Sequence, residues 1–311
     1  MAKIFVNITN ENWICDRFAE EWKTHNSSYS TSNIFEADII WLMASWGWNQ
    51  IHPQLLQNKI VVTTIHHLDL SKFNANEKVN FQQRDYFTNF YHVPCESTKN
   101  QLQNFTNKPI FVQSFWTNQE LWFPIEQKDE LRSEFGISLD KTLIGSFQRD
   151  TEGHDLKTPK LSKGPDVFCD IVEKLNENDG SVEVILSGWR RQYVMGRLDK
   201  AGIKYHYYNL VDFKTMNKLY NMLDLYIVSS RVEGGPQAIV ECALAKIPII
   251  STDVGIASQI LSLESLYDLK DFERAIPDIE CAYGNVQKYN IPHGFAEFNK
   301  FFNNIGKGAA E

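Results

Sequence analysis

The sequence lacks the cysteine patterns of a secreted or metal-binding protein. Its 311 residues include five cysteines, and these form neither a Cys-x-x-Cys pair nor a Cys/His pair at the spacing of metal ligands. This excludes a disulfide-stapled mini-protein. An odd, scattered set of cysteines indicates reduced thiols, as in cytosolic proteins.

Positive charge is also scarce. The chain has 31 Lys and Arg residues against 39 Asp and Glu residues, which gives a formal net charge of −8. A protein that binds nucleic acid by neutralising many phosphates carries the opposite balance. We therefore expect no nucleic-acid partner, and any cationic site must be local.

No apolar run is long enough to cross a bilayer. The most apolar stretch, Ile39–Trp48, has about half of the ~20 residues that a membrane-spanning helix needs. The apolar residues Ile4–Val6 near the N-terminus are too few for a signal peptide. We expect a cytoplasmic protein, with peripheral contact to the inner face of a membrane left open.

Common phosphate- and metal-binding motifs are missing as well. The Gly-x-Gly pattern occurs only at Gly306–Gly308, near the C-terminus, and there is no Walker lysine loop. Asp-x-Asp does not occur, which disfavours a Mg²⁺ or Mn²⁺ site built from paired carboxylates. The sequence therefore predicts neither a metal nor a bound cofactor.

The residues that are present predict an α/β fold. Short β-branched runs alternate with amphipathic stretches such as Trp13–Lys23 and Glu77–Phe87, which is typical of parallel sheets with crossover helices. The predicted strands are Lys3–Ile8, Asp38–Ala44, Lys59–Ile65, Phe90–Cys95, Ile110–Gln113, Leu143–Phe147, Val182–Ser187, Lys204–Tyr208, Leu225–Ser229 and Pro248–Ser251.

The alternation pauses at the polar segment Gln119–Glu130, which contains Pro124. We therefore expect two doubly wound domains, residues 1–124 and residues 125–292. In such sheets ligands bind beyond the carboxyl ends of the strands.

The most informative segment is Ser229–Lys246. It follows an apolar strand, crosses a turn at Gly234 and Gly235, and begins a helix with Pro236 in its first position. A helix N-terminus preceded by glycines suits an anion. Glu233 and Glu241 flank this turn. An ordinary loop acid and a solvated helix acid are the alternative, but Glu241 lies among apolar residues and so needs a partner.

This segment resembles the donor-site signature of the retaining family-four, or group 1, glycosyltransferases of GT-B fold. The resemblance rests on Glu233 and Glu241, on the Gly-Gly-Pro between them, and on the following Ala-x-x-Pro-Ile-Ile-Ser-Thr-Asp-Val-Gly-Ile. It covers Leu143–Leu261 and, more weakly, Ile60–Pro124. It implies two Rossmann-like domains facing a central cleft, with the donor held by the C-terminal domain and most of the acceptor by the N-terminal one.

The resemblance also implies roles for single residues. Glu233 contacts the transferred sugar, Glu241 holds the ribose, and the cations Arg149 and Lys163 bind the donor diphosphate. Lys157 and Lys160 are alternatives to Lys163. The remaining donor-binding candidates are Gly188, which gives the nucleotide room, Val211 near the base, and Gly234, Gly235 and Pro236 at the helix N-terminus.

Candidates on the acceptor side come from the N-terminal half. His66 matches a family histidine near the transferred sugar, with His67 as its alternative, although a hydrogen-bonded turn histidine is as common. The family's Gly-rich first loop is absent here, so Thr9, Asn10 or Asn12 is the substitute contact. Trp46 and Trp48 suit stacking on a sugar or packing in the core.

The C-terminal residues 293–311 complete the pattern. Phe295, Phe298 and Phe302 share one helical face. The resemblance implies that this helix packs back on the N-terminal domain.

The predicted function is transfer of a sugar from a nucleoside-diphosphate sugar to a hydroxyl acceptor on a glycan, a lipid-linked carrier or a small molecule. The resemblance implies retention at the anomeric carbon, and the missing Asp-x-Asp favours independence of metal. A nucleotide-sugar 2-epimerase of the same fold and a non-catalytic subunit that binds a nucleotide sugar or a partner are the alternatives.

Overall fold

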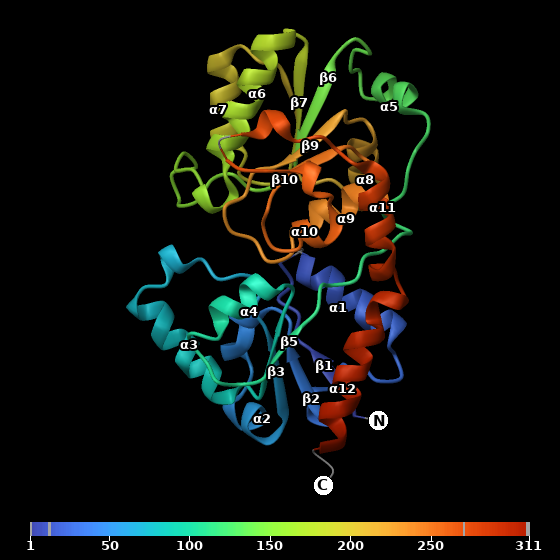
Figure 1. Cartoon of the computed structure of the whole chain (residues 1–311). Coiled ribbons are helices and arrows are strands. Elements are labelled where there is room, and N and C mark those ends of the chain that lie inside the picture. Colours follow the sequence, from blue (N-terminus) through green and yellow to red (C-terminus); the bar gives the residue numbers. More distant parts are fainter. Residues whose placement is uncertain (1, 12–13, 270, 309–311) are drawn as a thin grey trace. The chain divides into compact units, whose positions relative to one another are not determined.

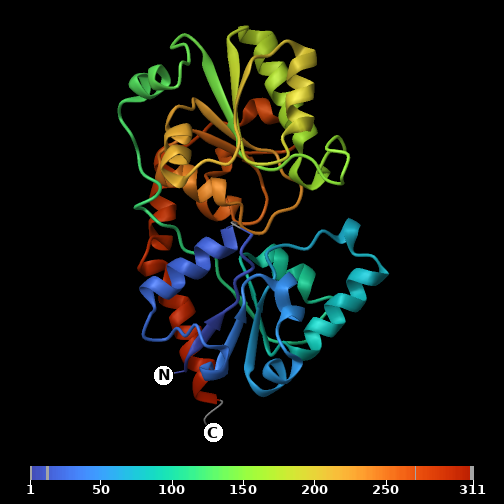
Figure 2. The same cartoon turned by 180° about the vertical axis from the view of Figure 1, so that it is seen from behind.

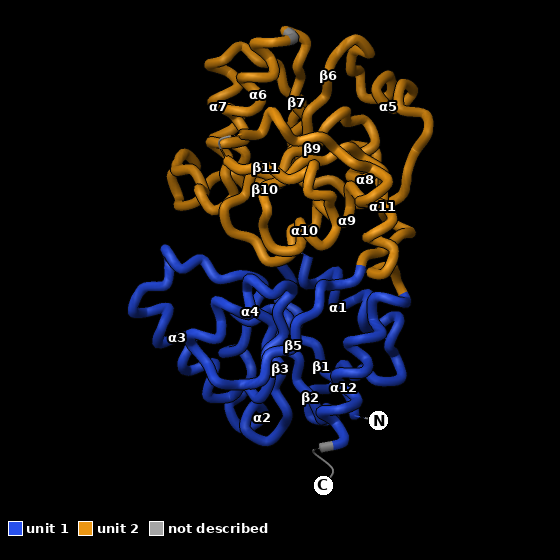
Figure 3. The backbone as a smooth tube through the Cα atoms, in the orientation of Figure 1, with its two compact units in different colours: residues 1–116, 292–311 blue, residues 117–291 orange. Residues whose placement is uncertain are grey.

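A computed structural model describes residues 2–11, 14–269 and 271–308 (Figure 1). The chain forms two compact units, residues 1–116 with 292–311 and residues 117–291 (Figure 3). The division thus falls after Trp116, ahead of Pro124. The segment around Pro124 lies in unit 2 because the amides of Phe123 and Ile125 donate to the side chains of Asn217 and Asn221.

Unit 1 is built on a parallel sheet of β1 (Ile4–Val6), β2 (Ile39–Leu42), β3 (Ile60–Thr64), β4 (Phe90–Val93) and β5 (Ile110–Val112), in that order. Ile4 pairs with Ile39 of β2 and also forms a parallel bridge with Ser30. After β1 the chain first pairs at Ser30 on one side of β1 and then forms β2 on the other side. The strand order therefore reverses at β1, which makes the sheet doubly wound. On the Ser30 side of β1 the pairing is limited to this single bridge.

The helices of unit 1 are α1 (Ile14–His25), α2 (Pro53–Asn58), α3 (Ala75–Phe87), α4 (Glu96–Leu102) and α12 (Ala296–Gly308). In the front and rear views, α1 and α12 lie on one side of the sheet and α2, α3 and α4 on the other (Figures 1 and 2). Phe298 of α12 packs against Trp41 and Trp116 with ring centroids 5.5 Å and 5.3 Å apart. The aromatic face of the C-terminal helix is thus part of the core of unit 1.

Unit 2 contains a six-stranded parallel sheet in the order β11-β10-β9-β6-β7-β8. Its strands are β6 (Thr142–Ser146), β7 (Val182–Ser187), β8 (Tyr205–Tyr208), β9 (Leu225–Val228), β10 (Ile249–Thr252) and β11 (Leu266–Tyr267). The chain proceeds from β6 to β8 on one side and then continues from β9 to β11 on the other. The order therefore reverses between β6 and β9, and the carboxyl ends of these strands form the expected ligand-binding edge.

Helices cover both faces of this sheet. They are α5 (Lys128–Glu134), α6 (Pro165–Asp179), α7 (Gln192–Ala201), α8 (Phe213–Asn221), α9 (Gln237–Leu244), α10 (Ala257–Ile260) and α11 (Ile279–Val286). Apolar residues of α6, α7 and the strands between them form one buried cluster around Phe168, Val184 and Leu198. No helix in the described ranges combines the length and apolar character that crossing a membrane requires.

Candidate functional site

The predicted site residues of unit 2 lie on loops that follow neighbouring parallel strands. Arg149 follows β6, Gly188 follows β7, and Glu233 follows β9. Strands β6, β7 and β9 are adjacent in the sheet. Their carboxyl ends therefore bring these loops to one edge, at the point where the strand order reverses.

Lys163 and Glu233 form an ion pair at this edge. The lysine side chain is 17% exposed and the glutamate side chain 10%. The following residue explains how they meet: Gly164 has φ +61°, and a Cβ there would lie 1.8 Å from the carbonyl oxygen of Ser229. Only glycine lets this loop approach the end of β9 so closely.

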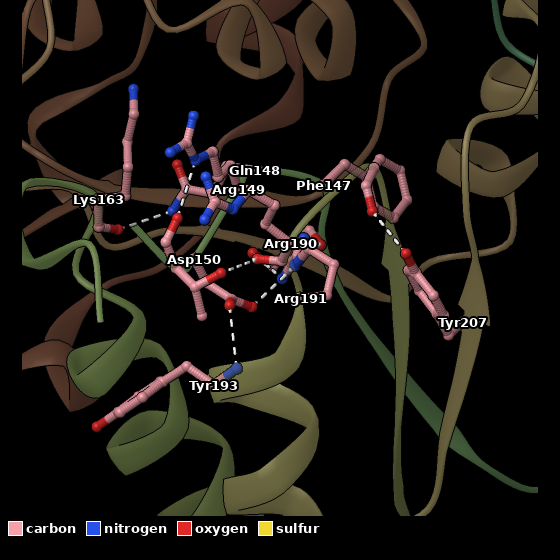
Figure 4. A network of polar contacts seen from close by, with 12 residues as sticks. Phe147, Gln148, Arg149, Asp150, Lys163, Arg190, Arg191, Tyr193 and Tyr207 are labelled. Carbon is pink, nitrogen blue, oxygen red and sulfur yellow. Dashed lines mark hydrogen bonds and ion pairs between the residues drawn. The ribbon is translucent and has the colours of Figure 1, made fainter. Parts of the chain in front are cut away.

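A side-chain amide links the two loops that carry this pair. The Gln148 Nε2 donates to the carbonyl oxygen of Lys163 at 2.8 Å, as Figure 4 shows. The Gln148 Oε1 accepts from Ser230 Oγ at 3.2 Å, and Ser230 Oγ lies 3.3 Å from Glu233 Oε1. Gln148 thus connects the loop after β6 with both partners of the ion pair.

Arg149 lies beside a second arginine. Its Nε donates to the carbonyl oxygen of Thr151 at 2.8 Å. Burial and the nearby positive charge of Arg190 lower the pKa of the Arg149 guanidinium, while Glu152 opposes this shift. Positive charge therefore accumulates between the loops after β6 and β7.

A buried ion pair beneath these loops fixes their positions. Arg191 Nε donates to Asp150 Oδ2 at 3.0 Å, and its Nη1 donates to the carbonyl oxygens of Ser146 and Ser187 at 2.5 Å and 3.0 Å. Burial raises the pKa of Asp150 more than the Arg191 charge lowers it. Because Ser146 ends β6 and Ser187 ends β7, Arg191 ties the two strand ends together.

Glu241 lies inside α9 and is 8% exposed. The hydroxyl of Tyr220 donates to its Oε2 at 2.8 Å. Burial, followed by the Glu241 charge, raises the pKa of Tyr220 well above its ordinary value, so the phenol keeps its proton. The partner that the buried carboxylate needed is thus a tyrosine from α8.

The glycine turn at Gly234 and Gly235, before α9, packs closely against the loop that contains Gly255. Gly255 has φ +58°, and a Cβ there would lie 2.2 Å from the carbonyl oxygen of Gly234. Pro236 is the N-cap residue of α9 rather than its first helical residue, because its ψ of 111° is extended. Gly234 and Gly235 therefore stand just before the helix N-terminus, one residue further from it than the sequence predicted.

The other donor-side candidates follow β7 and β8. Gly188 has φ +87°, and its carbonyl oxygen accepts from the hydroxyl of Tyr207 at 3.1 Å. Val211 is half-buried and precedes Asp212, the N-cap residue of α8. Lys163 and its two alternatives differ in their contacts. Lys163 forms the ion pair with Glu233, whereas Lys157 is exposed. The backbone amide of Lys160 donates to the carbonyl oxygen of Asp150.

The His66 side chain in unit 1 contacts two other groups of the same unit. Its Nε2 lies 2.9 Å from the carbonyl oxygen of Met43 and 3.4 Å from Cys15 Sγ. Burial lowers the pKa of His66 to about 4 and raises the pKa of Cys15 to about 12. Both groups are therefore neutral at pH 7, which rules out a thiolate and imidazolium pair.

Of the remaining acceptor-side candidates, Trp46 lies near His66, with ring centroids 6.2 Å apart. His67 is exposed. Trp46 and Trp48 lie in a 3-10 helix, Ser45–Gln50, after β2; Trp46 is 41% exposed, whereas Trp48 is half-buried and packs near Phe87 at 5.9 Å between ring centroids. Asn12 lies outside the described residues.

No cluster of three or more His, Cys, Asp or Glu side chains suited to a metal ion is found in the part of the chain that the structure describes. At the carboxyl ends of the unit 2 strands lie the cations Arg149 and Lys163, with the Glu233 carboxylate paired to Lys163. The two cations are of the kind that binds phosphate oxygens in proteins.

Comparison with known proteins supports the predicted family, with a family model that matches part of the chain. Residues 157–275 match the family model described as glycosyl transferases group 1. That range includes Lys163, Glu233 and Glu241. The chain contains a group 1 glycosyltransferase domain. This confirms the predicted family and enzyme class; no curated protein matches the sequence.

Solved glycosyltransferase structures share the fold. HepE of Anabaena, in complex with UDP-glucose, matches with a TM-score of 0.75 at 12% identity, covering 98% of this chain and 100% of HepE. Sucrose-phosphate synthase of Thermosynechococcus elongatus matches with 0.67 at 15% identity, covering 98% and 81%. A glycosyltransferase of Rickettsia africae matches with 0.59 at 14% identity, covering 96% and 83%. The predicted GT-B fold is thereby confirmed.

Several site residues of this glycosyltransferase were not predicted. Gln148, Arg190, Arg191 and Tyr220 all contact or adjoin predicted site residues. The sequence offered a signal for two of them, because Arg190 and Arg191 closely follow Gly188 at a strand end. Nothing in the sequence marks Gln148 or Tyr220, whose partners lie 15 and 21 residues away.

Proposed function

We propose that this glycosyltransferase moves a sugar from a nucleoside-diphosphate sugar to a hydroxyl acceptor, with retention at the anomeric carbon and without a metal. The observation that supports this best is the ion pair of Lys163 and Glu233 at the carboxyl ends of the unit 2 strands. The ion pair belongs to a hydrogen-bond network that also includes Gln148. A cation for phosphate and a carboxylate for the sugar are thus adjacent where the donor's reacting bond would lie.

The proposed chemistry uses these groups in distinct roles. Departure of the nucleoside diphosphate builds negative charge on its terminal phosphate, which Arg149, Lys163 and the amides at the start of α9 stabilise. The sugar ring gains positive charge at the same time, and Glu233 stabilises it. Glu241 binds the ribose, which does not change during the reaction. Fixed cations take the place that a metal holds in other transferases.

Similarity to known glycosyltransferases further supports retention at the anomeric carbon and the class of donor. The signature around Glu233 and Glu241 resembles that of retaining enzymes, and HepE of Anabaena was solved with UDP-glucose. We infer that the donor is a nucleoside-diphosphate sugar and that the acceptor is a carbohydrate or lipid-linked hydroxyl.

The test begins with thermal unfolding in the presence of UDP, GDP, ADP and their sugars, because a ligand that binds only the folded protein stabilises it. The stabilising donor is then incubated with the enzyme and candidate acceptors, with and without EDTA, and release of the nucleoside diphosphate is followed.

We expect release that survives EDTA and a product that keeps the donor's anomeric configuration. Loss of all activity on chelation, with recovery on adding Mn²⁺, would contradict the metal-free site. Conversion of the donor to an epimer without any acceptor would favour the epimerase, and binding without turnover would favour a non-catalytic subunit.

A further inference from the structure

Arg190 occupies an unusual backbone position at the end of β7. Its φ is +61°, in the left-handed region that residues other than glycine rarely adopt. Its carbonyl oxygen accepts from the amides of Asp150 and Thr151 at 3.1 Å and 3.2 Å. The strained conformation therefore joins the loop after β7 to the residue that directly follows Arg149, and such strain concentrates at functional sites.

The two arginines that follow Trp189 differ in environment. Arg191 is fully buried and paired with Asp150, so it is a structural residue. The Arg190 guanidinium donates through Nη2 to the carbonyl oxygen of Gly153, and its Nε is buried with no hydrogen-bond partner among the described residues. Arg190 thus keeps an unsatisfied donor beside Arg149 (Figure 4).

Placing two guanidinium groups together costs energy unless an anion compensates. The positive charges of Arg149 and Arg190 repel each other. The negative charge of Glu152 offsets this repulsion only in part at Arg149. Asp150 contributes little net charge because Arg191 neutralises it. An anion with several acceptor oxygens satisfies two guanidinium groups at once, and a diphosphate has this property.

We propose that Arg190 is a further donor-binding residue that contacts the diphosphate beside Arg149. This rests on the proposed function and adds a cation that the family signature does not include. The loop that carries Arg190 also carries Gly188, so one turn supplies both room for the nucleotide and charge for its phosphates.

The test is calorimetric titration of the intact protein with the nucleoside diphosphate, among UDP, GDP and ADP, that stabilises the wild type. Arg190→Asn removes the guanidinium but tolerates the positive φ, and it keeps the carbonyl that holds Asp150 and Thr151. Arg190→Lys retains a charge. Arg274→Asn is the matched control, because Arg274 is 86% exposed and pairs with Asp271 on the surface. The titrations are repeated over a range of salt concentrations.

We expect Arg190→Asn to raise the dissociation constant roughly tenfold or more, since a hydrogen bond to a charged group is lost. Its binding should also respond less steeply to salt than that of the wild type, a change that a purely structural role would not produce. Arg190→Lys should recover part of the affinity, and Arg274→Asn should bind normally.

Two results would overturn this role of Arg190 alone: normal binding by Arg190→Asn, or weaker binding with an unchanged salt response. Failure of the wild type to bind any of the three nucleotides would instead overturn the proposed function, and the role of Arg190 with it.

Discussion

At the scale of single residues, burial and pairing decide which ionisable groups are available for chemistry. Lys163 and Glu233 are 70 residues apart in sequence but meet in an ion pair, whereas the His66 imidazole is bonded to a backbone carbonyl. A predicted role could be assigned to each of these residues from its motif. Their mutual contacts could not be predicted, because each depends on a loop brought in from another strand.

His92 gives a prediction about pH. It is 1% exposed, its Nε2 lies 2.8 Å from the carbonyl oxygen of Gln113, and burial lowers its pKa to about 3. The unfolded chain, with an ordinary histidine pKa of about 6.5, therefore binds more protons as the pH falls below that value. Stability should be full above pH 6.5 and should decrease toward pH 3, with a loss of about 2 kcal/mol from this residue at pH 5.

The measurement is urea unfolding at pH 7.5 and pH 5.0 for the wild type and for His92→Gln. The variant should lose less stability between the two pH values, by about the 2 kcal/mol given by the pKa shift. An identical pH dependence in both proteins would show that His92 does not contribute to acid sensitivity.

At the scale of elements, the sequence pattern predicted the strands better than their surroundings. Ten predicted strands appear with ends displaced by up to two residues, and Val182–Ser187 matches at both ends. The short β11 was missed because Leu266–Tyr267 is too brief to show a period. Trp46 and Trp48 follow β2 in a 3-10 helix, where local hydrogen bonds override the apolar run.

The contact between Gly255 and the glycine turn gives a second prediction. In Gly255→Ala the new methyl group would collide with the Gly234 carbonyl in addition to straining φ. We expect the turn to shift, nucleotide binding to weaken and stability to fall by more than the roughly 1–3 kcal/mol cost of the strained backbone alone.

Gly202→Ala is the matched control for this variant. Gly202 has φ +66°, and a Cβ there would meet no other atom within 4 Å among the described residues, so alanine bears the backbone cost without a collision. Urea unfolding and nucleotide titration of both variants make the comparison. Equal nucleotide affinity in the two would mean that the contact does not shape the donor site.

The C-terminal helix gives a third prediction. Phe298 is fully buried against Trp41 and Trp116, so Phe298→Ala should leave a cavity and destabilise unit 1 by about 3–5 kcal/mol. Phe35→Ala replaces a residue that is 75% exposed and should change stability by no more than about 0.5 kcal/mol. Chemical denaturation followed by circular dichroism compares them. Similar losses in both would mean that α12 does not anchor the core.

At the scale of the whole molecule, the sequence predicted two α/β units and assigned the donor signature to the second. The chain enters unit 2 at Thr117 and leaves it just after Asn290, and these two residues form a parallel bridge. A boundary built from such a long-range bridge leaves no local composition signal, which is why the polar segment around Pro124 suggested a later position. The doubly wound order predicted for unit 1 rests on the single bridge between Ile4 and Ser30, a pairing too short to appear as a strand in the sequence pattern.

The central claim is that the loops at the carboxyl ends of the unit 2 strands bind the donor, with Glu233 at the transferred sugar and Glu241 at the ribose. Steady-state kinetics of Glu233→Gln and Glu241→Gln with the identified donor test it most directly, with Glu273→Gln, a change at an exposed position, as control. We predict a lower kcat for Glu233→Gln and a higher donor KM with a largely preserved kcat for Glu241→Gln, because only the sugar changes charge in the transition state. Kinetics indistinguishable from the control in both variants would contradict the claim.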